Sequence, residues 1–155
     1  DYADDVLAGL DVVVASLHGG LRQPRARLVE RQLRTLRNPH VDILAHPSGR
    51  LLERRDGGDF DWEQTFATAA ETGTALEINA DPARLDLDPT LARQAAEAGC
   101  LITINSDSHW VDGFSLAEYG VMMARKAWLK PDQVLNAWEP DRTRAWLRDR
   151  SSVSR

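Results

Sequence analysis

Apolar residues along the chain gather in four short runs that are separated by amphipathic segments. The runs are rich in Val, Ile and Leu, and they cover residues 11–18, 41–47, 74–80 and 101–109. Their length and their β-branched content are typical of strands. Because the apolarity is almost continuous, we expect strands that are buried on both faces, as in a parallel sheet.

The segments between and after these runs have helical spacing. Helices are predicted over residues 24–38, 61–73, 88–99, 115–129 and 130–139, with a short helix in the tail that follows. Asp61 and Asp88 are candidate N-caps, and Gly73 and Gly99 are stop signals. A strand–helix unit repeated four times predicts an α/β fold with right-handed crossovers. Half of a (β/α) barrel and one side of an open doubly wound sheet both satisfy this pattern.

Composition is ordinary for a globular domain and excludes few functions. The chain has 155 residues, 43% of them hydrophobic and 28% charged, with a net charge of −5 that does not indicate nucleic-acid binding. The single cysteine, Cys100, excludes an intrachain disulfide and fits a reducing cytoplasm. No apolar run approaches the roughly 20 residues of a membrane helix, so no membrane partner is expected.

Three of the four runs end on residues that bind metals well. His18 closes the first run, His46 the second, and Asp107 with His109 the fourth. Carboxyl ends of parallel strands meet on one face, so these side chains are expected to converge there. A lone histidine at a strand end is more simply a hydrogen-bonded core or loop residue. The matching positions favour a site for Zn²⁺, Mn²⁺ or Fe²⁺.

Several other polar residues are candidates for the same site. Glu77 lies within the third run, where a buried carboxylate needs a partner, either a ligand histidine that it orients or a structural salt bridge. Ser106 is expected to support the ligands beside it. Arg50 follows His46 and could clamp a phosphate, although a solvated loop charge is an equal alternative. Trp128, in an amphipathic segment, is expected in the core.

These motifs carry a resemblance to a known family. "ASLH", "NPHVDILAHPSGRLLERR", "LEINADPARLDL", "SDSH" and "GVMMARKAWLKPDQVLNAW" resemble the C-terminal part of a PHP (polymerase and histidinol phosphatase) domain, over residues 1 to about 138. The likeness is greatest to the PHP domain of bacterial family X DNA polymerases. The resemblance implies about four strand–helix units of a distorted, TIM-like (β/α)7 barrel. It also implies up to three divalent ions, Mn²⁺ or Zn²⁺, at the carboxyl ends of the strands.

The resemblance assigns roles to individual residues. His18, His46, Asp107 and His109 resemble metal ligands of the family, and Asp107 and His109 would act in catalysis. Arg50 would bind the substrate phosphate, while Glu77 and Ser106 would lie behind the ligands. The family's other ligands belong upstream of residue 1, so we expect residues 1–155 to be the C-terminal part of a single PHP domain. Such a piece is expected to be inactive alone and, with open sheet edges, poorly soluble or dimeric.

The implied function is phosphoester hydrolysis at DNA 3′ ends, of the 3′–5′ exonuclease type, in DNA repair. DNA would be reached through the full-length protein, which would carry an N-terminal polymerase region in the same polypeptide. Three alternatives stay open. They are a stand-alone PHP phosphatase acting on a small ester such as histidinol phosphate, a non-catalytic PHP scaffold, and, outside the family, a mononuclear amidohydrolase-like barrel.

Overall fold

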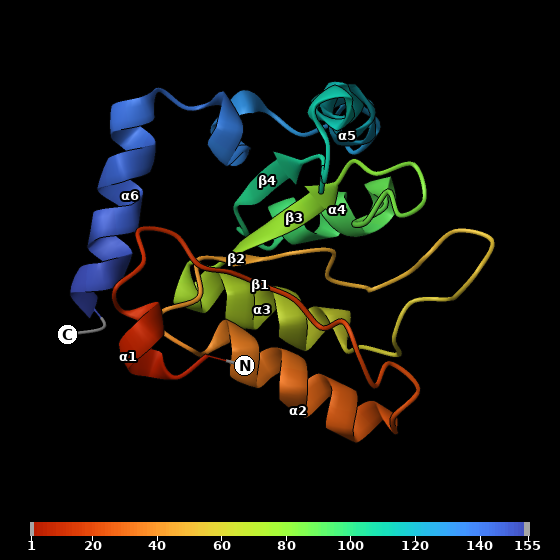
Figure 1. Ribbon diagram of the computed structural model, residues 1–155, viewed down its shortest axis with the longest axis horizontal. Coiled ribbons are helices and arrows are strands. Elements are labelled where there is room, and N and C mark those ends of the chain that lie inside the picture. Colours follow the sequence, from red (N-terminus) through yellow and green to blue (C-terminus); the bar gives the residue numbers. More distant parts are fainter. Residues whose placement is uncertain (1, 154–155) are drawn as a thin grey trace.

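The structure, a computed structural model, describes residues 2–153 and contains one parallel sheet. Its four strands lie in the order β1-β2-β3-β4, which is also their order along the chain (Figure 1). They are β1 (Val14–Ala15), β2 (Ile43–Leu44), β3 (Ala75–Asn79) and β4 (Ile102–Asn105). Every neighbouring pair is parallel. The α/β prediction is confirmed, and the architecture is that of consecutive units of a (β/α) barrel.

Helices alternate with the strands and follow the sequence signals closely. They are α1 (Asp4–Leu7), α2 (Arg25–Leu36), α3 (Trp62–Thr72), α4 (Pro89–Glu97), α5 (Ala117–Lys126) and α6 (Pro140–Val153). Asp61 caps α3 by accepting from the Gln64 N–H at 3.1 Å, and Asp88 caps α4 by accepting from the Thr90 N–H at 2.8 Å. A 3₁₀ helix, Val111–Leu116, precedes α5 and shortens the helix that was predicted to begin at residue 115.

The first two strands are much shorter than the apolar runs that contain them. The Asp42 side chain accepts a hydrogen bond from the Val13 N–H at 2.8 Å. This side chain takes the place of a backbone carbonyl of the neighbouring strand. The Val13 carbonyl accepts from both the Asp42 and the Ile43 N–H groups. Regular pairing therefore covers only two residues of each strand, although the chain remains extended on either side.

The prediction of a helix over residues 130–139 is wrong. Two 3₁₀ turns, Pro131–Gln133 and Leu135–Ala137, occupy this segment, separated by Val134 in extended geometry. Val134 forms a parallel bridge with Ile102, on the side of β4 that faces away from β3 and carries no further strand of residues 2–153. The Asn136 side chain accepts from the Ile104 N–H at 2.7 Å and donates to the Ile104 carbonyl at 3.0 Å. The hydrogen bonds that this segment makes to the edge of β4 therefore replace those of a helix.

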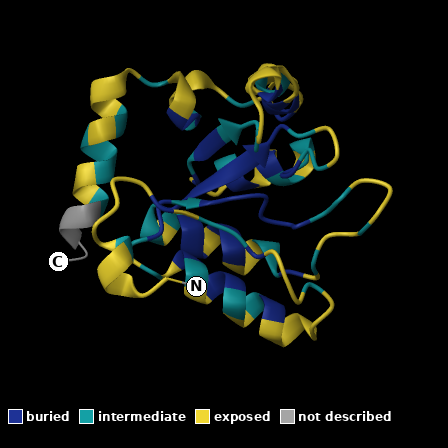
Figure 2. Ribbon diagram, viewed as in Figure 1, coloured by how far each residue is buried: buried dark blue, intermediate teal, exposed yellow. Residues whose placement is uncertain are grey.

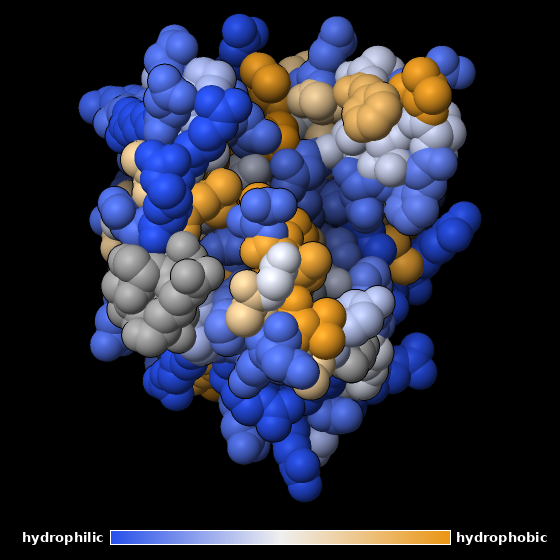
Figure 3. Space-filling view, turned by 60° about the vertical axis from the view of Figure 1, so that its left-hand side comes forward, coloured by the Kyte–Doolittle hydropathy of each residue, from blue (hydrophilic) through white to orange (hydrophobic). Residues whose placement is uncertain are grey.

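The core lies between the sheet and helices α2, α3, α4 and α5, while part of the sheet stays open. Figure 2 shows buried residues concentrated in β2, β3 and β4 and in the helices beside them. Along the first strand, Val13 is buried, whereas Val12 and Val14 are 42% and 53% exposed. Figure 3 shows apolar side chains gathered at the centre of one face, among hydrophilic ones. The side of β1 that lacks helices thus exposes apolar surface.

Helix α6 is anchored at the amino ends of the strands. The Arg150 guanidinium donates to the Val41 carbonyl at 2.5 Å and forms an ion pair with Asp42 at 3.3 Å, with both side chains largely buried. Trp128, expected in the core, is 79% exposed, because α5 ends there with Trp128 at φ 60° and the chain turns away. No helix within the described part of the chain is long and apolar enough to cross a bilayer.

Candidate metal centre

Two of the three histidines predicted as ligands, His18 and His46, lie against each other at the carboxyl ends of β1 and β2. Their ring centroids are 4.8 Å apart, and the rings meet edge to face. His46 is buried, and its φ of 31° is unusual for a residue other than glycine. Its Nδ1 is shielded from solvent and has no hydrogen-bond partner within residues 2–153. His18 is exposed. The pair therefore combines one free buried imidazole nitrogen with one accessible ring.

Asp107 and His109 follow β4 in a tight local arrangement. The His109 Nδ1 lies 2.8 Å from the Asp107 carbonyl oxygen. A carbonyl can only accept, so Nδ1 carries the hydrogen and, in the neutral ring, Nε2 keeps its lone pair. Asp107 has a φ of 53°, a second left-handed backbone at a predicted ligand. A backbone held in this sparsely populated region is typical of functional sites.

An arginine that the sequence analysis did not consider connects the two pairs. The Arg84 Nε lies 3.3 Å from Asp107 Oδ2, and the two side chains are 14% and 31% exposed. The positive charge of the same guanidinium also affects the pKa of His46. Burial first, then the charge of Arg84, lowers the pKa of His46 to about 4. His46 is therefore neutral at pH 7, which is the form that can bind a metal.

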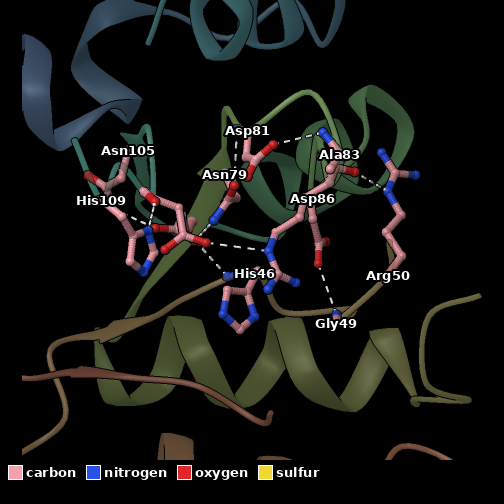
Figure 4. A network of polar contacts seen from close by, with 12 residues as sticks. His46, Gly49, Arg50, Asn79, Asp81, Ala83, Asp86, Asn105 and His109 are labelled. Atoms are coloured by element: carbon pink, nitrogen blue, oxygen red, sulfur yellow. Dashed lines mark hydrogen bonds and ion pairs between the residues drawn. The ribbon is translucent and has the colours of Figure 1, made fainter. Parts of the chain in front are cut away.

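Glu77 lies behind this rim and holds it together by hydrogen bonds. Its carboxylate accepts from the His46 N–H at 2.7 Å, from the Asn79 amide at 3.1 Å and from the Asn105 amide at 2.8 Å. Figure 4 shows His46, Asn79 and Asn105 coming together from neighbouring strands. Burial raises the pKa of Glu77 despite these donors. No ion pair to Glu77 forms within the described residues, so neutral donors alone hold this carboxylate.

The two asparagines were missed by the sequence analysis, although a signal for them exists. Both strands end on the same dipeptide, Ile–Asn, in "LEIN" and "ITIN". Asn79 and Asn105 are partners in the parallel register of β3 and β4, which brings both amides to one level of the sheet. A repeated polar residue at the end of two apolar runs could have indicated this support for Glu77.

Asp86, another residue that the analysis missed, fixes the loop after β2. It is fully buried, and its carboxylate accepts from the N–H groups of Ser48 and Gly49, the latter at 2.9 Å (Figure 4). Burial raises the pKa of Asp86. A carboxylate that accepts several backbone N–H groups is a strong local tether. The segment that follows His46 is therefore tied to the turn that carries Arg84.

Arg50 is bonded to that same turn. Its Nε donates to the Arg84 carbonyl at 2.8 Å, another nitrogen donates to the Leu85 carbonyl, and the guanidinium lies 3.5 Å from Asp88. These contacts occupy the N–H groups of the Arg50 guanidinium that was predicted to bind phosphate. The phosphate role of Arg50 stays a prediction. Ser106 lies half-buried between β4 and Asp107, and its supporting role stays a prediction as well.

The donor set suits a divalent ion but does not form a complete site. Imidazole nitrogens and a carboxylate are the ligands expected for zinc or manganese, and Nδ1 of His46 is a buried ring nitrogen with no hydrogen-bond partner among the described residues. Within residues 2–153, however, no three His, Cys, Asp or Glu side chains come close enough to hold one ion. His18 with His46, and Asp107 with His109, are two separate pairs that need further ligands.

The arrangement defines a class: part of a (β/α) barrel with a polar rim at the carboxyl ends of its strands. No family model matches the chain. Over 137 residues it is 46% identical to the DNA polymerase/3′-5′ exonuclease PolX of Bacillus subtilis, covering 88% of the chain and 24% of that protein. It is 28% identical over 145 residues to a probable phosphatase of a Thermoanaerobacter species, covering 88% of the chain and 57% of that protein.

A probable phosphatase of a Shewanella species is 32% identical over 117 residues, covering 70% of the chain and 44% of that protein. The chain thus spans about a quarter of the polymerase/exonuclease and about half of the phosphatases that it matches. The matches confirm the resemblance to part of a PHP domain of the kind found with family X DNA polymerases.

Proposed function

We propose that the chain is the C-terminal part of a PHP domain that acts as a metal-dependent phosphoesterase. The observation that carries the proposal is the contact between the rings of His18 and His46 at the carboxyl ends of the strands, where Asp107 also lies. Names of relatives support it, since one is a polymerase/exonuclease and others are probable phosphatases. The open apolar side of β1 suits the remaining strands of the barrel, which would lie elsewhere in the same polypeptide.

The proposed mechanism assigns the chain's own residues to binding and orientation. His46 would offer its buried Nδ1 and His18 its ring to one ion, while Asp107 and the Nε2 of His109 would serve others. When bound, such ions would supply Lewis acidity toward phosphoryl oxygens and lower the pKa of water. Glu77 holds the backbone of His46 in place, and the Asp107 carbonyl fixes the ring of His109.

The preferred substrate is a phosphodiester or phosphomonoester at a DNA 3′ end. This choice rests on the Bacillus subtilis relative, whose name includes a 3′-5′ exonuclease and whose identity to the chain is 46%. Hydrolysis of a small phosphate ester is the second candidate, because the relatives called probable phosphatases match much of the chain at 28–32% identity. The ions we propose are Mn²⁺ or Zn²⁺, which suit mixed imidazole and carboxylate ligands.

The test compares variants of the full-length polypeptide that contains this chain. His46→Ala and Asp107→Ala are expected to lower both bound metal, measured by mass spectrometry, and hydrolysis of a 3′-labelled oligonucleotide, the latter by about 100-fold or more. His40→Ala is the matched control, since His40 lies before β2, away from the carboxyl ends of the strands. Normal hydrolysis in both site variants would contradict the proposal.

Parallel assays with histidinol phosphate separate the two substrates. Cleavage of the oligonucleotide alone supports the DNA 3′ end, and cleavage of the small ester alone supports the second candidate. A protein that binds no metal and cleaves neither would be a scaffold, and the proposal would then be wrong.

A further inference from the structure

Gln32 is a fully buried amide in the middle of an apolar helix face, and neither the sequence motifs nor the proposed mechanism uses it. It lies on α2 between Leu28 and Leu36, four residues from each, and all three side chains are buried in the core. Burying an amide is unfavourable unless its polar atoms are hydrogen-bonded. A leucine at this position would continue the apolar stripe, so core packing alone does not explain the glutamine.

The Gln32 amide bonds in two directions. Its Nε2 donates to the Pro47 carbonyl at 3.0 Å, and its Oε1 accepts from the hydroxyl of Thr65 on α3 at 2.6 Å. Thr65 is fully buried as well. Within residues 2–153, Gln32 supplies the one hydrogen bond that the Pro47 carbonyl accepts. Helices α2 and α3 are thereby connected to the residue that directly follows His46.

The backbone at His46 needs support of this kind. His46 has a φ of 31°, whereas a residue that precedes proline prefers extended geometry. Such a conformation persists only where the surrounding structure holds it. Glu77 accepts from the His46 N–H at 2.7 Å on the N-terminal side of the turn, and Gln32 holds the Pro47 carbonyl on its C-terminal side. The two hydrogen bonds therefore fix the chain before and after His46.

We infer that Gln32 is a positioning residue, whose hydrogen bond to Pro47 orients the imidazole of His46 for metal binding. This inference rests on the proposed function and names a residue of an outer helix that sets the affinity of the site. The competing explanation is that Gln32 only stabilises the contact between α2 and α3. In that case Asp86, which binds the next two N–H groups of the loop, would hold the turn by itself.

The first experiment titrates Mn²⁺ by calorimetry into the full-length protein, after EDTA has stripped its metals and been removed. Gln32→Met keeps the length of the side chain but loses the amide, and we expect the Kd of one Mn²⁺ to rise about 10-fold, the lower end of the range for groups that orient a ligand. Thr65→Val is expected to raise the Kd by less, because it removes only the partner of Gln32.

Thr74→Val is the matched control for these variants. Thr74 is as deeply buried as Thr65, but its hydroxyl bonds the carbonyls of Leu36 and Val41, at the amino ends of the strands. We expect this variant to leave the Kd of Mn²⁺ unchanged, although it also loses a buried hydroxyl.

Hydrogen exchange in the metal-free protein supplies a readout that a merely structural role would not move. In Gln32→Met the His46 N–H is expected to exchange about 10-fold faster relative to the Leu76 N–H, which bonds the Leu101 carbonyl from β3. General destabilisation would raise both rates together. If Gln32→Met does not fold, Thr65→Val provides the same two measurements with smaller shifts.

An unchanged Mn²⁺ Kd in a folded Gln32→Met protein overturns the inference, and so does a parallel rise of both exchange rates. A wild-type protein that binds no Mn²⁺ would contradict the proposed function instead. In that case a raised exchange rate of the His46 N–H alone would still support the hold of Gln32 on the turn, and an unchanged ratio of the two rates would overturn it.

Discussion

The carboxylate of Glu77 on β3 accepts a hydrogen bond from the backbone N–H of His46, just after β2, at 2.7 Å. A buried acid on one strand thus sets the end of the neighbouring strand, where the backbone of His46 has positive φ. The same carboxylate receives the Asn79 and Asn105 amides. One side chain therefore positions a predicted ligand and joins β2, β3 and β4 at their carboxyl ends.

Replacing Glu77 with alanine should destabilise the protein strongly. Three donors would lose their acceptor, including a buried backbone N–H, and each such loss costs roughly 1–3 kcal/mol. We expect Glu77→Ala to lower the free energy of unfolding by about 3 kcal/mol or more and Glu77→Gln by less, measured by urea denaturation. Glu71→Ala, at an exposed position of α3, is the matched control and should have little effect. Equal stability of all variants would contradict this role of Glu77.

Removing the Asp86 carboxylate should loosen the loop after β2. Its oxygens hold the N–H groups of Ser48 and Gly49, and Arg54 and Arg55 further along that loop are sites for trypsin. We expect Asp86→Ala to raise the rate of trypsin cleavage at this loop by about 10-fold under native conditions, since about 1–2 kcal/mol of tethering is lost. Asp56→Ala, an exposed aspartate of the same loop, should leave the rate unchanged. Slow cleavage in Asp86→Ala would show that other contacts hold the loop.

Acid should destabilise the metal-free protein through His46. The pKa of His46 is lowered to about 4 in the folded state, from 6.5, mainly by burial. The unfolded chain therefore binds the proton more tightly, and stability falls as pH drops from about 6.5 toward 4. With EDTA present, His46 should contribute a loss of about 2 kcal/mol between pH 7 and pH 5.

The His46→Asn variant separates this contribution from those of other groups. It should be less stable at pH 7, but its stability should fall less between pH 7 and pH 5 than that of the wild type. His40→Asn should follow the wild-type profile. Identical pH profiles for wild type and His46→Asn, in urea unfolding, would show that His46 does not titrate as its burial indicates.

Asn136 should protect the outer edge of β4. Its side chain bonds both the N–H and the carbonyl of Ile104, as a neighbouring strand would. In Asn136→Ala we expect the Ile104 amide to exchange with deuterium about 10-fold faster, because about 1 kcal/mol of local protection is lost. Gln133→Ala, in the preceding turn, is the control. An unprotected edge also favours pairing between chains, which size-exclusion chromatography would detect as added self-association.

Local physical chemistry explains most of what could be predicted from the sequence. Asp61 and Asp88 cap their helices where expected, because capping depends only on residues a few positions apart. The apolar runs mark all four strands, since burial on both faces leaves a continuous hydrophobic pattern. Parallel pairing then brings His18 next to His46 at the ends of their strands.

Local pattern failed where a distant partner decided the outcome. Residues 130–139 have helical spacing, yet Val134 and Asn136 bond to β4 instead. Trp128 looks like a core residue, yet the left-handed end of α5 leaves it exposed. In both cases a tertiary contact or turn outweighs a helical preference of a few tenths of a kcal/mol per residue.

The order of residues along the chain was enough to determine the alternation of strands and helices and the rim on which His18, His46, Asp107 and His109 lie. Only the tertiary structure decided which arginine reaches that rim. Arg50 and Arg84 are equally basic and both follow a strand, but Arg50 is bonded to the turn that presents Arg84 to Asp107. That choice depends on the packing of two loops far apart in the sequence, which no local periodicity encodes.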